Sequence, residues 1–277
     1  MKLDRGRNAL PVGKSEILAF IGQRESIKPD WFEALPFPVD SEWGSAFLLY
    51  AAALKGIIPE PQTGQFLSAL WEAYGLQLFR LSHRPYEELF DFVAGGKWGD
   101  DPQRSKIAGI LRSVSDFFFK QGTVSQYILK GISGEAMVDD LAAQIFWMGK
   151  TSTYKNKARF FLWLAYQAGL APVSLLESAA APLTRGHMQW IAAFGDRGFK
   201  ERFFQATPPA KLAMVSKWLR EILPLGDWKA FLAMDEFLNR QGPNSFLCRF
   251  ARKSCDRCPL QKVCPGAALD PGKGLPP

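Results

Sequence analysis

The chain has 277 residues, 47% of them hydrophobic, which is enough to form a hydrophobic core in one large domain or in two closely packed ones. Its formal net charge of +7 fits a polyanionic partner. No stretch reaches roughly 18 consecutive apolar residues and the N-terminal sequence has no secretory-type apolar run, so we expect a cytoplasmic protein without a membrane partner.

Helical periodicity runs through most of the chain. In the segment 104–121, apolar residues from Ile107 to Phe118 share one face. Alternating patterns of β-branched residues are scarce, so the sequence predicts an all-α fold. The expected helices are, in chain order, 45–54, 65–79, 86–94, 104–121, 137–148, 158–168, 211–223 and 228–240.

All four cysteines lie near the C-terminal end with the spacing C-x6-C-x2-C-x5-C. Thiolates this close together can enclose one metal centre, either a tetrahedral zinc ion or a [4Fe–4S] cluster. Two disulfides would instead need an oxidising compartment. A zinc ion remains an alternative to the cluster, although zinc sites usually have two C-x2-C pairs and only one is present here. The cysteines are Cys248, Cys255, Cys258 and Cys264, and cations interleave with them at Arg249, Arg252, Lys253, Arg257 and Lys262.

This spacing, with Ala251-Arg252-Lys253 before the second cysteine, resembles the iron–sulfur cluster loop of endonuclease III and the adenine-DNA glycosylases. The resemblance implies a [4Fe–4S] cluster with a structural and DNA-positioning role. It also implies a helix-hairpin-helix DNA glycosylase fold that binds double-stranded DNA in base excision repair as a monomer. The corresponding regions would be a six-helix domain at 41–170, a cluster domain from 1–40 and 171–265, and a flexible tail at 266–277.

The family's hairpin reads leucine, proline, glycine, valine, glycine, followed by a basic residue, lysine and a small residue. The counterpart here is IFWMGKTSTYKNKARFFLWL, which has one glycine and no proline. The resemblance implies that backbone amides at this helix N-terminus bind a DNA phosphate. A plain basic loop between helices is an equally good interpretation. The candidate DNA-binding residues are Gly149, Lys150, Thr151, Ser152 and Lys155.

In bifunctional members of the family, a lysine early in the next helix attacks the sugar C1′ and forms a Schiff base. Lys157 approximately matches that position, and Lys155 is the second candidate. Such a lysine must be deprotonated, which burial and neighbouring cations promote. The alternative is that both lysines simply face phosphates.

The family's essential aspartate lies in a valine-aspartate-threonine-histidine motif, whose closest match here is PLTRGHM. His187 aligns with the histidine, but the aspartate position is Arg185, which we count among the DNA-binding candidates. A cation cannot stabilise a cationic transition state. Either another acid serves or the chain does not cleave glycosidic bonds by this mechanism. The alternative acids are Asp139, Asp140, Glu177 and Asp196, each of which is also explained as a helix N-terminal charge or a solvated loop residue.

His187 would either contact a phosphate or polarise a water molecule, or it has a structural role.

Three functions remain open: a DNA glycosylase with or without lyase activity, an inactive iron–sulfur DNA-binding relative, and a helical protein with a structural zinc ion that acts on RNA or a protein. Arg185 favours the second, and the cysteine spacing opposes the third. A glycosylase needs a wedge and a stacking pocket. Its candidates are Phe146, Trp147, Trp163 and Trp190, of which Trp163 is expected in the core.

Overall fold

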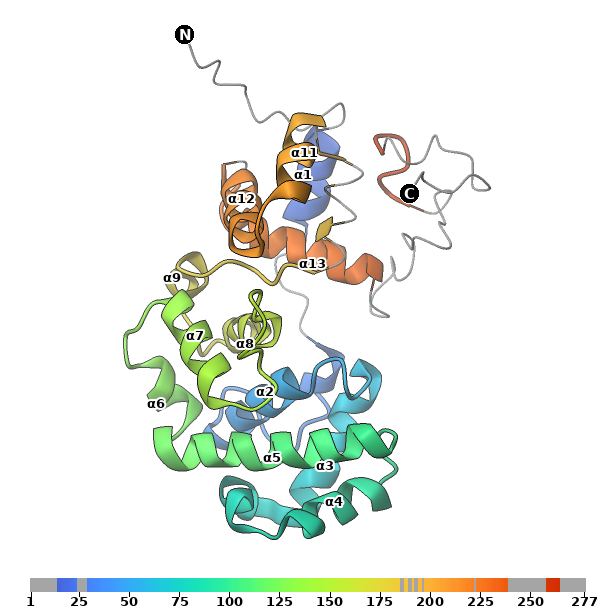
Figure 1. The fold of residues 1–277 in the computed structure, drawn as a ribbon. Helices are drawn as coiled ribbons and strands as arrows, with labels where there is room; N and C mark the ends of the chain where they lie inside the picture. Colours follow the sequence, from blue (N-terminus) through green and yellow to red (C-terminus); the bar gives the residue numbers. More distant parts are fainter. Residues whose placement is uncertain are drawn as a thin grey trace. The chain divides into compact units, whose positions relative to one another are not determined.

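The fold was analysed in a computed structural model, which describes residues 14–23, 29–184, 187–188, 191, 194–195, 197–221, 223–238 and 258–264. These residues are mostly helical and form no β-strand, so the predicted all-α class is confirmed. None of the helices in this part of the chain is long and apolar enough to cross a membrane. The chain divides into two compact units, Lys28–Pro182 and a terminal unit made of Met1–Ile27 and Leu183–Pro277 (Figure 1).

Helices α2 (Glu42–Leu54) and α8 (Asn156–Gln167) form the centre of the Lys28–Pro182 unit and pack against each other. Every residue of α2 from Gly44 onward is buried, as expected for a helix that is apolar on all sides. The helix begins at Ser41, whose hydroxyl accepts a hydrogen bond from the Gly44 amide at 2.9 Å. The predicted six-helix range, 41–170, lies inside this unit.

The other helices of the unit surround this pair. The longest, α5, packs against α2, α4 and η2, and crosses the unit in Figure 1. It begins with a capping box between Asp100 and Gln103, and ends at Gly122 with a φ of 81°. The surrounding elements are η1 (Asp30–Phe32), α3 (Glu60–Tyr74), η2 (Gly75–His83), α4 (Tyr86–Gly95), α5 (Asp101–Gln121), α6 (Val124–Ile128), α7 (Gly134–Gln144) and α9 (Val173–Glu177).

Each of the eight predicted helices is present as a helix, with shifted ends. The predicted helix 65–79 is wrong at its C-terminal end, because Gly75 adopts a φ of 51° and separates α3 from η2. The predicted 137–148 is wrong at both ends. Its helix α7 begins after the capping Ser133 and stops at Gln144, because Ile145 turns to an extended ψ of 124°.

The terminal unit is a separate set of helices. In this unit α1 (Lys14–Gly22) and α12 (Pro208–Arg220) both pack against α13 (Gly226–Leu238), and α11 (Arg197–Gln205) packs against α12. Trp228 and Phe231 of α13 are fully buried. Periodicity did not predict α1, α6, α9 or α11, since each has only one or two helical turns, too few for a clear repeat.

Candidate functional site

The predicted counterpart of the family's hairpin lies in the turn between α7 and α8, residues 145–155. Three of its residues have left-handed backbone conformations: Trp147 with a φ of 71°, Gly149 with a φ of 109° and Lys155 with a φ of 45°. The first two are two positions apart. Met148 lies between them, is fully buried, and donates its amide to the Ile145 carbonyl at 3.2 Å. The Ser152 amide closes a second tight turn on the Gly149 carbonyl at 2.9 Å. Residues 145–152 are thus held in two consecutive turns.

These turns leave several polar groups available at the surface. The amides of Trp147, Gly149, Lys150 and Thr151 have no hydrogen-bond acceptor in the part of the chain that the structure describes. The side chains of Lys150, Thr151 and Ser152 are exposed. The turn leads into α8, whose N-terminus has no side-chain cap. Amides, hydroxyls, an ammonium group and the positive end of a helix dipole together suit an anion such as phosphate.

Arg159 fixes the end of this turn from within the core, where only 3% of its surface is exposed. Its Nη1 and Nη2 donate to the Glu135 carboxylate of α7 at 2.7 and 2.8 Å. It also donates to the carbonyls of Tyr154 at 2.9 Å and Ala180 at 2.8 Å. Burial opposes ionisation of Glu135, but the bonds from Arg159 and the Ala180 amide outweigh it, so its pKa is lowered. The guanidinium therefore connects both helices to the turn.

The two acidic candidates on α7 already have partners. Asp139 accepts from Lys155 Nζ at 2.5 Å, and Asp140 accepts from the Tyr127 hydroxyl at 2.7 Å and from Gln144 at 2.7 Å. Both carboxylates lie in the second turn of α7, not in the first turn as the predicted start at 137 implied. Burial, together with the bond to Asp140, raises the pKa of Tyr127. Both carboxylates are therefore explained by structural contacts with neighbouring side chains.

Lys157 lies at the start of α8 and points toward α2. Its Nζ donates to the Ala53 carbonyl at 2.6 Å. Ala53 belongs to the last turn of α2, where carbonyls lack intrahelical partners and the helix dipole is negative. Burial lowers the pKa of Lys157 to about 7. At neutral pH a large fraction of this amine is therefore unprotonated, which is the form that acts as a nucleophile.

Three further candidates have the following surroundings. His187 is 1% exposed, accepts the Thr184 amide on Nδ1 at 3.3 Å and stacks on Phe231. Glu177 is the exposed last residue of α9. Trp163 is buried, as a core residue would be.

The C-terminal cysteine loop is described only between its third and fourth cysteines. Cys258 and Cys264 are both partly exposed. No group of three metal-ligating side chains occurs among the residues that the structure describes. Nine predicted residues lie outside the described residues: Arg185, Trp190, Asp196, Cys248, Arg249, Arg252, Lys253, Cys255 and Arg257.

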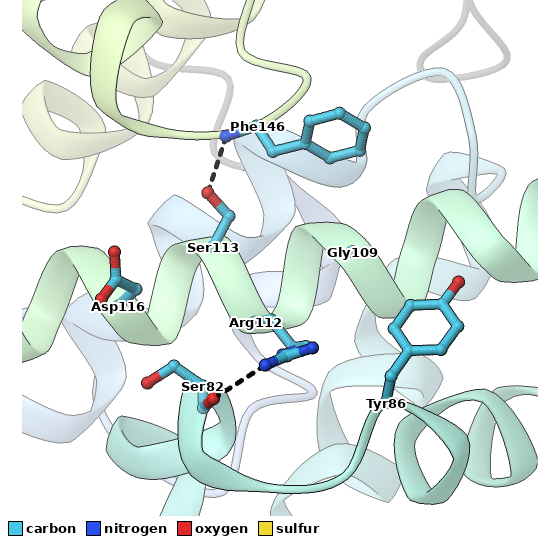
Figure 2. A pocket seen from close by; sticks show the side chains of 7 residues that line it. All are labelled: Ser82, Tyr86, Gly109, Arg112, Ser113, Asp116 and Phe146. Atoms are coloured by element: carbon cyan, nitrogen blue, oxygen red, sulfur yellow. Dashed lines mark hydrogen bonds between the residues drawn. The ribbon is translucent and has the colours of Figure 1, made fainter.

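A pocket of about 490 Å³ lies beside the α7–α8 turn and was not predicted (Figure 2). The same face of α5 contributes Gly109, Arg112, Ser113 and Asp116, at spacings of three, one and three residues. The walls are Ser82, Tyr86 and Phe146. The sequence contained one indication of this pocket, the polar positions of α5 opposite its apolar face. The sequence does not reveal which loop covers these positions.

Phe146 joins the turn to this pocket. Its amide donates to the Ser113 hydroxyl at 2.7 Å (Figure 2). Its ring lies over Gly109, where a Cβ atom would approach it to 3.2 Å. The small residue therefore allows the turn to pack closely on α5.

Comparisons of this chain with protein families, curated proteins and solved structures found no match.

Proposed function

We propose that this protein binds double-stranded DNA through the α7–α8 turn and is a divergent relative of the helix-hairpin-helix DNA glycosylases. The observation that carries the proposal is the backbone of the turn. Its unpaired amides at Trp147, Gly149, Lys150 and Thr151 lie next to exposed hydroxyl and ammonium groups. Such a group of donors fits a phosphate of the DNA backbone.

The pattern of left-handed residues supports the same relationship. Placed on residues 145–149, the family's leucine, proline, glycine, valine and glycine put their two glycines at Trp147 and Gly149. These positions have φ values of 71° and 109°. The valine position is the buried Met148. Left-handed conformations favour glycine, so the backbone at both positions would suit the family's two glycines, although this chain has tryptophan at the first.

The cysteine loop supports the proposal through its donor set. Four thiolates suit a [4Fe–4S] cluster, with zinc as the alternative. Between Cys258 and Cys264 the backbone is turned by hydrogen bonds from Gln261 to Cys258 at 3.0 Å and from Cys264 to Leu260 at 2.9 Å. Leu260 is buried. This half of the loop is compatible with metal binding, and Cys248, Cys255, Cys258 and Cys264 would hold the cluster.

The test is fluorescence anisotropy of a labelled duplex over a range of salt concentrations. The wild type should bind with an affinity that falls as salt rises, and Lys150→Ala should weaken binding and reduce the salt slope by about one. Lys97→Ala, which removes an exposed lysine outside the turn, is the matched control. No binding at low salt, or identical curves for Lys150→Ala and the wild type, would contradict the proposal.

A second candidate function is cleavage at abasic sites, and the environment of Lys157 favours it. Its unprotonated Nζ would add to the C1′ aldehyde of an abasic site and lose water, which forms an imine. Nζ would first have to leave the Ala53 carbonyl. Borohydride reduces such an imine to a stable covalent complex. Trapping by the wild type and its loss in Lys157→Ala would support a lyase.

If trapping and base release from lesion-containing duplexes are both absent, the protein is a binding-only relative. Two observations favour that outcome over glycosidic cleavage. Arg185 occupies the family's aspartate position, and Asp139 and Asp140 are engaged by Lys155 and Tyr127.

A further inference from the structure

The pocket beside the turn contains unused hydrogen-bonding groups. The Ser82 hydroxyl is buried and has no hydrogen-bond partner within the described part of the chain. Arg112 donates one bond from Nη2, to the Ser82 carbonyl at 3.2 Å (Figure 2). A guanidinium group has five N–H donors, so most of them are left for a ligand. The Ser82 hydroxyl is too buried to reach a ligand, so the Arg112 guanidinium is the group that can bind one.

The pocket offers a hydrogen-bond donor and a hydrogen-bond acceptor beside flat apolar surface. Arg112 can only donate, whereas the carboxylate of Asp116, one turn further along α5, can only accept. Its Oδ2 already accepts from Lys120 Nζ at 2.5 Å, so Oδ1 is the acceptor left among the described residues. The rings of Tyr86 and Phe146 line the same pocket. A planar ligand with a donor and an acceptor on its edge satisfies all four residues, and nucleobases have this chemistry.

The rings of Tyr86 and Phe146 suit the flat face of a base, which a phosphate does not have, so the base is the part that enters. A lysine of α5 lies beside one of the exposed rings of the turn. Lys106 Nζ is 5.0 Å from the ring centre of Trp147, and Trp147 follows Phe146 at a ring separation of 5.6 Å. Both rings are unusually exposed, 50% for Phe146 and 44% for Trp147. Two adjacent aromatic faces with a nearby lysine are the arrangement on which successive unpaired bases stack.

We propose that this surface binds single-stranded DNA next to a duplex, with one unpaired base in the pocket against Phe146 and a neighbouring base on Trp147. The proposal rests on the proposed function in taking DNA as the partner. It adds a site for an unpaired strand within the Lys28–Pro182 unit, formed by α5 and the aromatic residues of the turn.

The test compares a labelled blunt duplex with the same duplex carrying a short single-stranded overhang, by fluorescence anisotropy. The wild type should bind the overhang duplex about tenfold more tightly, because stacking of one base on an aromatic side chain is worth about one order of magnitude or more. Phe146→Ala should lower the affinity for the overhang duplex more than the affinity for the blunt duplex, and so remove most of this preference. Phe119→Ala is the control, since Phe119 is an exposed phenylalanine of α5 outside the pocket.

Phe146→Leu keeps an apolar side chain over Gly109 and removes only the aromatic face, so it carries the test if Phe146→Ala unfolds at a lower temperature. Equal wild-type affinities for the two duplexes would overturn the single-strand site and leave the proposed function standing. A preference that survives in both Phe146 variants would also overturn it. Failure to bind either duplex would overturn the site and the proposed function together.

Discussion

Arg159 and Glu135 form two parallel hydrogen bonds of 2.7 and 2.8 Å that join the start of α8 to the start of α7. The same guanidinium holds the carbonyls of Tyr154 and Ala180. Since Arg159 is buried and has four acceptor atoms, it organises the turn between the two helices from the inside. The geometry of the proposed phosphate site therefore depends on a residue that does not reach the surface.

Arg159→Ala is expected to destabilise the protein by about 2–3 kcal/mol, because it leaves Glu135 and two backbone carbonyls without their donor. The estimate is at the low end for a buried ion pair because the Glu135 side chain is nearly half exposed. Chemical denaturation measures the change. Arg104→Ala, which removes a surface pair with Asp101, is the control and should change stability by less than about 0.5 kcal/mol. Equal effects of the two substitutions would show that Arg159 does not hold the turn.

Lys157 predicts an unusual pH dependence of stability. Its folded pKa of about 7 is below the ordinary value of 10.5, so the unfolded state binds more protons between these values. The cost of burying the ammonium is fully present below about pH 7 and is relieved as pH rises. The stability of the wild type relative to Lys157→Met should therefore increase by about 1–2 kcal/mol between about pH 7 and pH 9. Denaturation curves at several pH values measure it, and parallel profiles would contradict the burial of this amine.

Gly149 predicts a link between backbone conformation and DNA binding. Alanine there would be strained at a φ of 109°, and its Cβ would lie 3.1 Å from the Lys155 Cα. Gly149→Ala should cost about 1–3 kcal/mol of stability and weaken duplex binding, because the free amides move. Gly95→Ala is the control, since a Cβ at the end of α4 meets nothing within 4 Å. If Gly149→Ala is destabilised but binds duplex DNA as tightly as the wild type, the turn is not part of the DNA-binding surface.

The cations of the cysteine loop predict a second phosphate contact. The double variant Arg252→Ala/Lys253→Ala should weaken duplex binding and reduce the salt slope by about two, since each residue would neutralise one phosphate. Anisotropy titrations at several salt concentrations measure both quantities. An unchanged slope and affinity in the double variant would remove the loop from the DNA-binding surface.

The four cysteines predict one bound metal centre. Purified protein should be brown with stoichiometric iron and sulfide, and Cys258→Ala should lose the colour and lower the thermal stability. Metal analysis and visible absorption spectra measure this. A colourless protein with stoichiometric zinc would keep the loop but argue against the glycosylase resemblance.

Local sequence patterns were sufficient to predict most of the helices. The apolar face from Ile107 to Phe118 predicted the body of α5, and the largely apolar helices α2 and α8 became the central helices of their unit. Helix propensity and amphipathic spacing act within a few turns, so they can be read without the fold. The cysteine spacing is equally local. The ends were less predictable, as α7 shows, because backbone conformations at Ile145 and Trp147 depend on what the turn packs against.

The chemistry of the candidate site was decided by residues far apart in the chain. The pKa of Lys157 follows from burial beside Ala53, which is 104 residues away. The turn is held by contacts that reach Glu135, Ala180 and Ser113, and the pocket exists only because Phe146 covers α5 at Gly109. By itself the sequence determined most of the helices and the spacing of the four candidate thiol ligands. Only the tertiary structure decided which amine is depleted of protons, which carboxylates are already paired and where a base could lie, because burial and hydrogen bonding arise from long-range packing.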